Sequence, residues 1–198
     1  MRKDTLYYKR IYPLLFMLLI TVVCISITSG LYLSTQQRVI ANETLFLKKT
    51  ILEAADVEYP DNFQEITTIY NNTVVEESGY YTVATGVEAV YVMPFTGPGL
   101  WGPIELMVGF RDDLDALTGI GIVSQNETPG LGARIEEEWF KKQFAGKWGP
   151  FTLVEEGTAT RTDQIDSITG ATRTSRSIQA ILNKAVSEGP ALVQAKGE

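Results

Sequence analysis

An uncharged, apolar run between residues 11 and 33 constrains this chain more than any other feature. A helix rises about 1.5 Å per residue and needs about 20 apolar residues to cross about 30 Å of hydrocarbon, so the run is long enough to span a bilayer. Four basic residues precede it and one follows closely: Arg2, Lys3, Lys9 and Arg10, then Arg38. Because basic residues favour the cytoplasmic side, we predict a single-pass helix in the inner or cytoplasmic membrane, with the N-terminus in the cytoplasm.

The same run divides the chain of 198 residues into an anchor and one domain, since a domain takes roughly 100–200 residues. We expect residues 1–33 to form the cytoplasmic N-terminus and a lipid-embedded anchor. Residues 34–60 are then a helical connector, and residues 61–198 an extracytoplasmic domain. The alternative for the apolar run is a cleaved secretory signal, which usually has a shorter apolar core and a small-x-small cleavage site.

The composition excludes several classes of function. The chain has no histidine, and its one cysteine is Cys24 inside the apolar run, so the usual ligands of zinc and iron–sulfur centres are missing and we predict no metal site. A formal net charge of -7 disfavours nucleic acid as a partner. Two acidic runs, residues 136–138 and 155–156, are expected to be solvated surfaces. Because the usual metal ligands are missing, electron transfer by this protein would require an organic cofactor.

The order of predicted elements indicates an α+β fold. Apolar residues at loose helical spacing between residues 34 and 57 predict that the membrane helix continues or restarts there. A mixed segment follows, with a turn at Asn71-Asn72, and Asp112-Asp113 is typical of a tight hairpin. Strands followed by helices favour an antiparallel sheet covered by helices on one face. Strands are predicted at residues 79–93, 104–111, 117–124 and 151–154, and helices at residues 134–144 and 172–186.

Residues 166–172, DSITGAT, directly precede the last predicted helix. The first turn of a helix has unpaired backbone N–H groups and the positive end of the helix dipole, which together favour a phosphate. Arg173 and Arg176 are placed to add charge-assisted hydrogen bonds to phosphate oxygens. The alternative is that the serine, threonines and aspartate only cap the helix.

This run resembles the attachment motif of the FMN-binding domain family, D-x-x-[ST]-G-A-[TS]. The matching residues are Asp166, Thr169, Gly170, Ala171 and Thr172. Members of that family carry FMN as a phosphoester on the final threonine or serine, attached by a separate flavin transferase. The resemblance therefore implies covalent FMN on Thr172, with Thr169, Gly170, Ala171 and Arg173 at the binding site, and a flavin transferase as a partner in maturation.

Two glycine-rich segments resemble the same family and occur in the same order along the chain: residues 97–102 (GPGLWG) and residues 127–132 (ETPGLG). Glycine turns let the backbone approach a flat ring closely. Leu100, Trp101 and Leu131 supply apolar faces expected to exclude water from an isoalloxazine, and Thr128 is expected to hydrogen-bond its polar edge. The alternative for the tryptophan is a packing residue buried between Gly-Pro turns.

A single N-terminal membrane helix followed by a compact FMN-binding domain is similar to two kinds of protein. These are the G subunit of Rnf ferredoxin:NAD oxidoreductases and the C subunit of sodium-pumping NADH:quinone reductases. The latter is usually longer, so the short chain favours the Rnf type. The resemblance implies a membrane-anchored electron-transfer subunit of an ion-translocating complex, with other membrane subunits as partners. The isolated chain is not expected to be catalytic. Two alternatives are a flavinylated relay in another membrane reductase and a non-redox extracytoplasmic scaffold.

Overall fold

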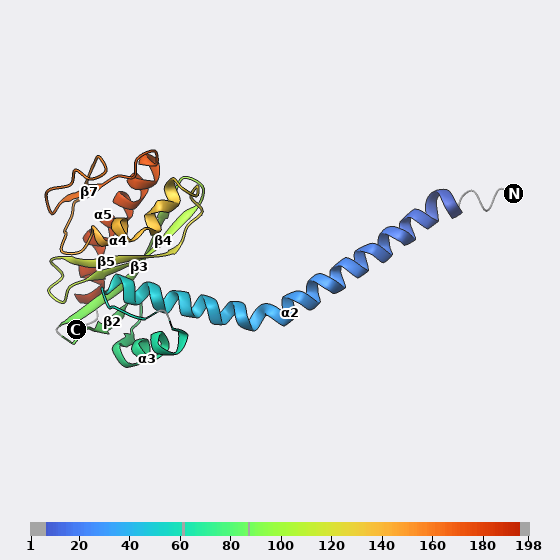
Figure 1. The fold of residues 1–198 in the computed structure, drawn as a ribbon, viewed down its shortest axis with the longest axis horizontal. Coiled ribbons are helices and arrows are strands. Elements are labelled where there is room, and N and C mark those ends of the chain that lie inside the picture. Colours follow the sequence, from blue (N-terminus) through green and yellow to red (C-terminus); the bar gives the residue numbers. More distant parts are fainter. Residues whose placement is uncertain (1–6, 61, 87, 195–198) are drawn as a thin grey trace. The chain divides into compact units, whose positions relative to one another are not determined.

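A computed structural model describes residues 7–60, 62–86 and 88–194 (Figure 1). The chain divides after Thr44 into a membrane-helix unit and a folded domain that begins at Leu45. Arg2 and Lys3, which contribute to the predicted topology, lie outside the described residues.

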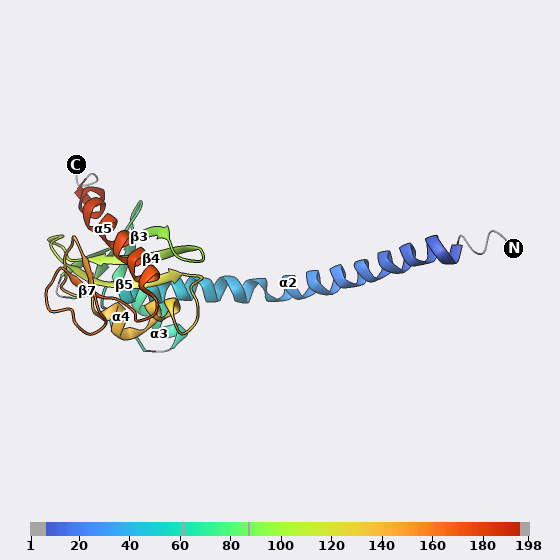
Figure 2. The same cartoon turned by 90° about the horizontal axis from the view of Figure 1, so that it is seen from above.

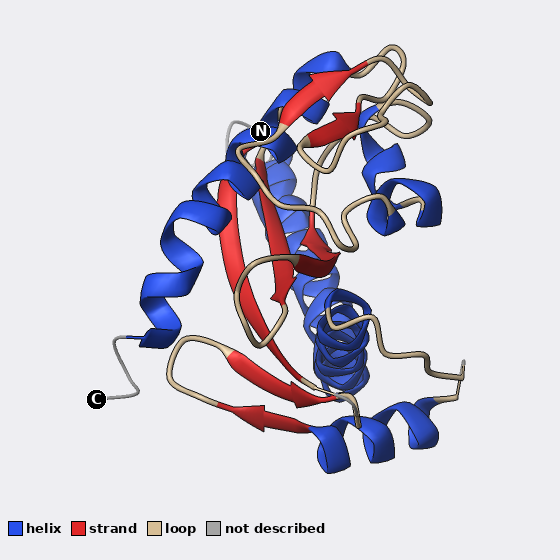
Figure 3. Cartoon of the chain, turned by 90° about the vertical axis from the view of Figure 1, so that its left-hand side faces the viewer, coloured by secondary structure: helices blue, strands red, loops and turns tan. Residues whose placement is uncertain are grey.

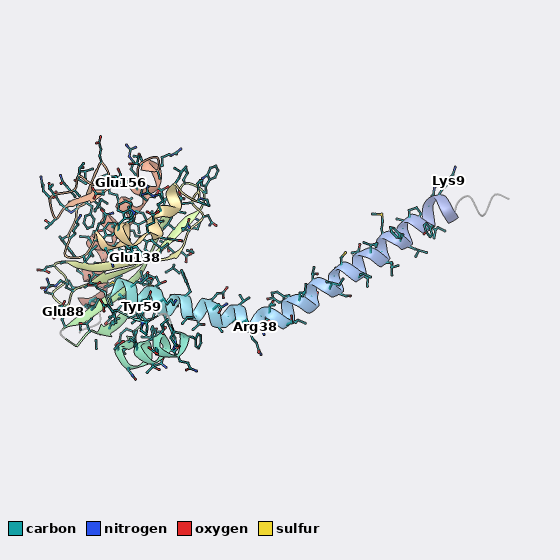
Figure 4. All side chains as sticks on the ribbon, viewed as in Figure 1. Lys9, Arg38, Tyr59, Glu88, Glu138 and Glu156 are labelled. Atoms are coloured by element: carbon teal, nitrogen blue, oxygen red, sulfur yellow. The ribbon has the colours of Figure 1, made fainter. Side chains whose placement is uncertain are left out.

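The first unit is helical throughout its described length. A short π-helical turn, η1 (Tyr7–Ile11), leads into one continuous α-helix, α2 (Tyr12–Ala54), which contains the predicted membrane span. Side chains between Lys9 and Arg38 are exposed and project from all sides of the helix (Figure 4). Several of its serine and threonine hydroxyls donate to carbonyls about one turn earlier, as Thr21 does to Met17 at 2.8 Å, which satisfies them without water. With a mean hydropathy of 2.5 over its most apolar window, this helix is long and apolar enough to cross a membrane.

The domain is built on a five-stranded antiparallel sheet whose strands neighbour one another in chain order. The predicted strand 79–93 is in fact a hairpin, because Gly86 adopts a φ of +87° and reverses the chain. The predicted tight hairpin at Asp112-Asp113 is part of a longer loop, residues 111–116. The strands are β1 (Val74–Glu76), β2 (Tyr81–Ala84), β3 (Ala89–Pro98), β4 (Pro103–Phe110) and β5 (Leu117–Ser124).

One predicted turn is wrong. Asn71 and Asn72 lie inside α3 (Phe63–Thr73), a helix that packs Ile66 into the interior. The side chain of Asn62 caps its start by accepting a hydrogen bond from the Gln64 backbone N–H at 3.0 Å. A good cap and a buried apolar residue outweigh the local turn preference of the two asparagines.

The C-terminal helix, α5 (Thr172–Gln194), lies across β3 and β4 (Figure 2). It buries Ile178, Ile181 and Leu182 in the larger hydrophobic core, together with Phe110 and Phe140. Gly97 on β3 permits this close packing, since a Cβ there would lie 2.5 Å from Cγ1 of Ile181. The helix that begins at Thr172 is thereby held firmly against the sheet.

The end of α2 covers the opposite face of the sheet, so the expectation of helices on one face only is wrong (Figure 3). Ile51 and Ala54 pack with valines of β2 and β3. Glycines of β4 and β5 admit the helix backbone: a Cβ at Gly109 would lie 2.0 Å from the Ala54 carbonyl oxygen. The Thr118 hydroxyl donates to the same oxygen at 2.7 Å. The apolar spacing in residues 34–57 predicted a helix, but it did not predict that the end of this helix packs on the sheet.

The remaining elements lie between β5 and α5 along the chain. The predicted helix 134–144 is divided at Glu137, whose extended backbone separates a 3₁₀ turn, η2 (Gly132–Glu136), from α4 (Glu138–Lys142). The predicted strand 151–154 is present as β6 (Thr152–Val154), which pairs in parallel with β7 (Gln164–Asp166). The antiparallel sheet and its flanking helices form the predicted α+β fold.

Candidate functional site

The three segments identified in the sequence meet at the start of α5 and enclose a pocket of about 270 Å³. Most of the predicted site residues line it, whereas Trp101 and Thr169 lie beside it. A larger cavity of about 410 Å³, between Glu53 and Lys141, contains none of them. The residues that line the smaller pocket are Leu100, Glu127, Thr128, Leu131, Gly132, Gly170, Ala171, Thr172, Arg173 and Thr174.

Thr172 is the first residue of α5, and its side chain is exposed. Gly170 turns the chain into the helix with a φ of +81°, a conformation that favours glycine. The Ala171 carbonyl accepts the Ser175 N–H at 3.0 Å, so Ala171 stands at the capping position and offers no side-chain acceptor. The first-turn amides of α5 have no acceptor within the helix and receive none from this cap. The interpretation of the motif as side-chain capping is therefore wrong at the capping position.

Glu156 holds the loop that carries the motif. Its carboxylate accepts the backbone N–H of Thr169 at 2.8 Å and lies 3.1 Å from Nη2 of Arg134. These contacts, first that of Thr169 and then that of Arg134, lower the pKa of Glu156 from 4.5 to about 2. Arg134 also pairs with Glu137 at 3.2 Å. The two acidic runs were expected to be only solvated surfaces. Each of them contributes one residue, Glu137 or Glu156, to the ion pairs with Arg134.

Asp166, the first residue of the motif, organises a neighbouring turn. Its Oδ1 accepts the backbone N–H groups of Thr158 at 3.0 Å and Ala159 at 2.9 Å. Its own backbone N–H donates to Oε1 of Gln143 at 2.6 Å. The aspartate therefore orders the loop between β6 and β7, from which Glu156 reaches Thr169.

Glu127 is a site residue that the sequence analysis missed. Only 5% of it is exposed. Its Oε1 accepts the backbone N–H groups of Leu100 at 2.7 Å and Trp101 at 3.2 Å, and its Oε2 accepts the hydroxyl of Thr174 at 2.5 Å. One feature of the sequence could have identified it: Glu127 is the single acidic residue in residues 127–132, which are otherwise small, turn-forming or apolar.

Two glycines of the loops make room for this carboxylate. A Cβ at Gly99 would lie 2.6 Å from Oε1 of Glu127, and a Cβ at Gly132 would lie 2.8 Å from Oε2 and 2.6 Å from the Thr174 hydroxyl. The glycines were expected to let the backbone approach a flat ring closely. At Gly99 and Gly132 the group that lies close to the backbone is the Glu127 side chain.

The apolar rim of the pocket is open to solvent. Leu100 is 40% exposed, Trp101 69% and Leu131 44%, so the alternative of a buried packing tryptophan is wrong. The indole N–H of Trp101 donates to the hydroxyl of Thr128 at 3.1 Å, which holds the ring beside the pocket. Arg173 and Arg176 are exposed at the start of α5. The pocket is slightly smaller than the roughly 300–1,000 Å³ usual for ligand sites.

Comparison with known proteins gives consistent matches. Residues 99–187 match the FMN-binding domain family, a range that includes all three segments around the pocket except residues 97 and 98 of the first. The G subunit of an ion-translocating oxidoreductase complex from Methanosarcina acetivorans is 30% identical over 140 residues, which are 71% of this chain and 71% of that protein. The G subunit of a proton-translocating ferredoxin:NAD(+) oxidoreductase complex from Clostridium ljungdahlii is 34% identical over 119 residues, 59% of this chain and 63% of that protein.

The fold has solved counterparts. The crystal structure of the C subunit of the Na(+)-translocating NADH-quinone reductase from Parabacteroides distasonis superposes with a TM-score of 0.66 at 24% identity, covering 77% of this chain and 94% of that one. The present chain spans 63% of the length of the C. ljungdahlii relative and 71% of the M. acetivorans relative. From the sequence matches and the shared fold, the chain belongs to the FMN-binding domain family, with the G subunits of ion-translocating oxidoreductase complexes among its relatives.

Proposed function

We propose that this chain is a membrane-anchored electron-transfer subunit of an Rnf-type ion-translocating ferredoxin:NAD oxidoreductase complex, carrying FMN as a phosphoester on Thr172. The observation that carries the proposal is the position of Thr172: it opens α5, lines the pocket and completes a full match to the attachment motif. FMN supplies the redox chemistry when it is bound, and the chain supplies position, burial and charge.

The residues around Thr172 suit the phosphate end of the cofactor. The first-turn amides of α5 and the helix dipole favour an anion, and Arg173 lines the same pocket. Gly170 places the turn, and the Glu156 contact to Thr169 keeps it in place. The exposed hydroxyl of Thr172 is open to a flavin transferase.

The exposed rim supports a role within a complex. Leu100, Trp101 and Leu131 present apolar surface beside the pocket, where they suit the face of an isoalloxazine. Because this chain leaves them open, we expect another membrane subunit to complete the enclosure. On this proposal the protein relays electrons and does not turn over a substrate by itself.

The assignment to the Rnf type rests on the two relatives described above, one of which aligns over 71% of both chains. Likeness to the quinone reductase C-subunit structure, at 24% identity, supports the fold. We retain the proposed anchor at residues 1–33, connector at 34–60 and extracytoplasmic domain at 61–198, with the end of the connector, from Leu45 on, packed as part of the folded domain. The positive charges before the membrane span support this orientation.

Replacing Thr172 by alanine tests the attachment directly. We expect Thr172→Ala to abolish covalent flavin, because the hydroxyl oxygen becomes the ester oxygen, whereas Thr172→Ser keeps a hydroxyl and should retain it. Flavin fluorescence of the denatured protein band and intact mass of the full chain are the measurements. A fluorescent Thr172→Ala band would refute the attachment site, and a wild-type chain without flavin mass would favour the scaffold alternative.

A further inference from the structure

Glu127 is the only acidic side chain that is buried among the residues that the structure describes. Removing a carboxylate from water is unfavourable unless hydrogen bonds and favourable charges compensate for it. The compensation here comes from three donors: the backbone N–H groups of Leu100 and Trp101 and the hydroxyl of Thr174. A carboxylate only accepts, so these three donors match its ionised form.

The three donors come from two different parts of the pocket. Leu100 and Trp101 belong to the turn between β3 and β4, and Thr174 belongs to the first turn of α5. Glu127 itself lies in the loop after β5, so one side chain joins three segments that are distant along the chain. The indole of Trp101 then bonds back to Thr128, the residue after the glutamate. These hydrogen bonds link the β3–β4 turn, the loop after β5 and the start of α5 to one another along one wall of the pocket.

General stability does not explain a buried charge at this position. Well-packed apolar side chains are often as stabilising as buried charges or more so, so a leucine or methionine would serve a purely packing role. Glu127 also lines the pocket together with Thr172 and Arg173. What its carboxylate provides beyond packing is directional bonding to two loop amides and a fixed negative charge on the pocket wall.

We propose that Glu127 is the positioning residue of the flavin pocket. Its carboxylate fixes the Leu100–Trp101 turn against the start of α5 before any cofactor is attached, and its charge opposes the arrival of an electron on a cofactor held there. The first part concerns the protein alone, and the second rests on the proposed flavin at Thr172. Two measurements on the full chain in detergent therefore test it.

The first measurement is amide hydrogen exchange in a Thr172→Ala background, which carries no covalent flavin on the present proposal. Adding Glu127→Ala should speed exchange at the Leu100 and Trp101 amides by about tenfold or more, because they lose a charged acceptor. Glu127→Gln should largely rescue it, since the amide oxygen can accept from both N–H groups while its NH₂ donates to the Thr174 hydroxyl. Peptides of β4 should exchange as before.

The exchange result has two outcomes that overturn the proposal. Unchanged exchange at Leu100 and Trp101 in Glu127→Ala would show that the carboxylate does not hold the turn. Equal acceleration throughout the domain would show a general structural role. Glu188→Gln at the far end of α5 is the matched control, because it removes one carboxylate charge at an exposed position.

The second measurement is the midpoint potential of the flavin in the loaded chain. Glu127→Gln should shift it to a more positive value, because a negative charge on the pocket wall is removed while the hydrogen bonds remain. Glu188→Gln should leave it unchanged. A potential in Glu127→Gln equal to that of wild type would overturn the role of the charge. If the wild-type chain carries no flavin, the proposed function fails, and the exchange experiment still decides whether Glu127 positions the turn.

Discussion

Replacing Gly121 by alanine should weaken the packing of the α2 end on the sheet. A Cβ at this position would lie 2.4 Å from the carbonyl oxygen and 2.5 Å from Cγ2 of Thr50, so the helix backbone itself has to move. Overpacking of this kind costs about 1–3 kcal/mol. Alanine recovers about 0.4–1 kcal/mol by restricting the unfolded chain. Taking the middle of both ranges, we expect a net loss of about 1–2 kcal/mol from the free energy of unfolding.

Gly119→Ala is the matched control, on the same strand and the same face. Its Cβ would lie 3.2 Å from the carbonyl oxygen of Glu53 and 3.3 Å from that of Ala54, contacts that small shifts can relieve. The gain from the unfolded state should then offset the cost, leaving stability near that of wild type. The two variants differ in contact distance while the substitution is the same.

Thermal unfolding of the full chain in detergent, followed by tryptophan fluorescence, measures the difference. All three tryptophans, Trp101, Trp139 and Trp148, lie outside the membrane helix, so their signal reports the folded domain. At about 2–4 °C per kcal/mol for a domain of this size, Gly121→Ala should lower Tm by about 2–8 °C. Equal Tm changes in the two variants, or a higher Tm for Gly121→Ala, would refute close packing of α2 on β5.

Two further predictions concern charge and topology. The pKa of Glu156 lies at about 2, below its ordinary 4.5, so its stabilising contribution is present above about pH 4.5 and is lost as the pH falls towards 2. The Tm difference between wild type and Glu156→Gln should therefore shrink over that range. A constant difference would show that the contacts of the Glu156 carboxylate with Thr169 and Arg134 do not stabilise the fold. For topology, protease added to right-side-out vesicles should digest the domain after α2, and digestion confined to inverted vesicles would reverse the orientation.

Local sequence patterns were sufficient to predict the features that depend on neighbouring residues. An unbroken apolar run predicted the helix that α2 contains, because crossing hydrocarbon requires only length and hydropathy. Apolar spacing placed the start of the last helix at Thr172, and β-branched residues between turn formers placed β4 and β5 within one residue. Local signals failed where a cap and burial overrode them, as for Asn71 and Asn72 in α3.

Which distant segments meet depends on how the helices and strands pack together. The sequence around Glu127 does not show which groups its carboxylate meets, because its three donors are 26, 27 and 47 residues away along the chain. The same holds for Gly109 and Gly121, whose missing side chains matter only because the α2 backbone packs there. Trp101 is exposed for a related reason, since its indole is held at the pocket edge by Thr128 from another loop. Short-range pattern specifies the elements, whereas burial and hydrogen bonding at the pocket arise from contacts that form only when those elements pack.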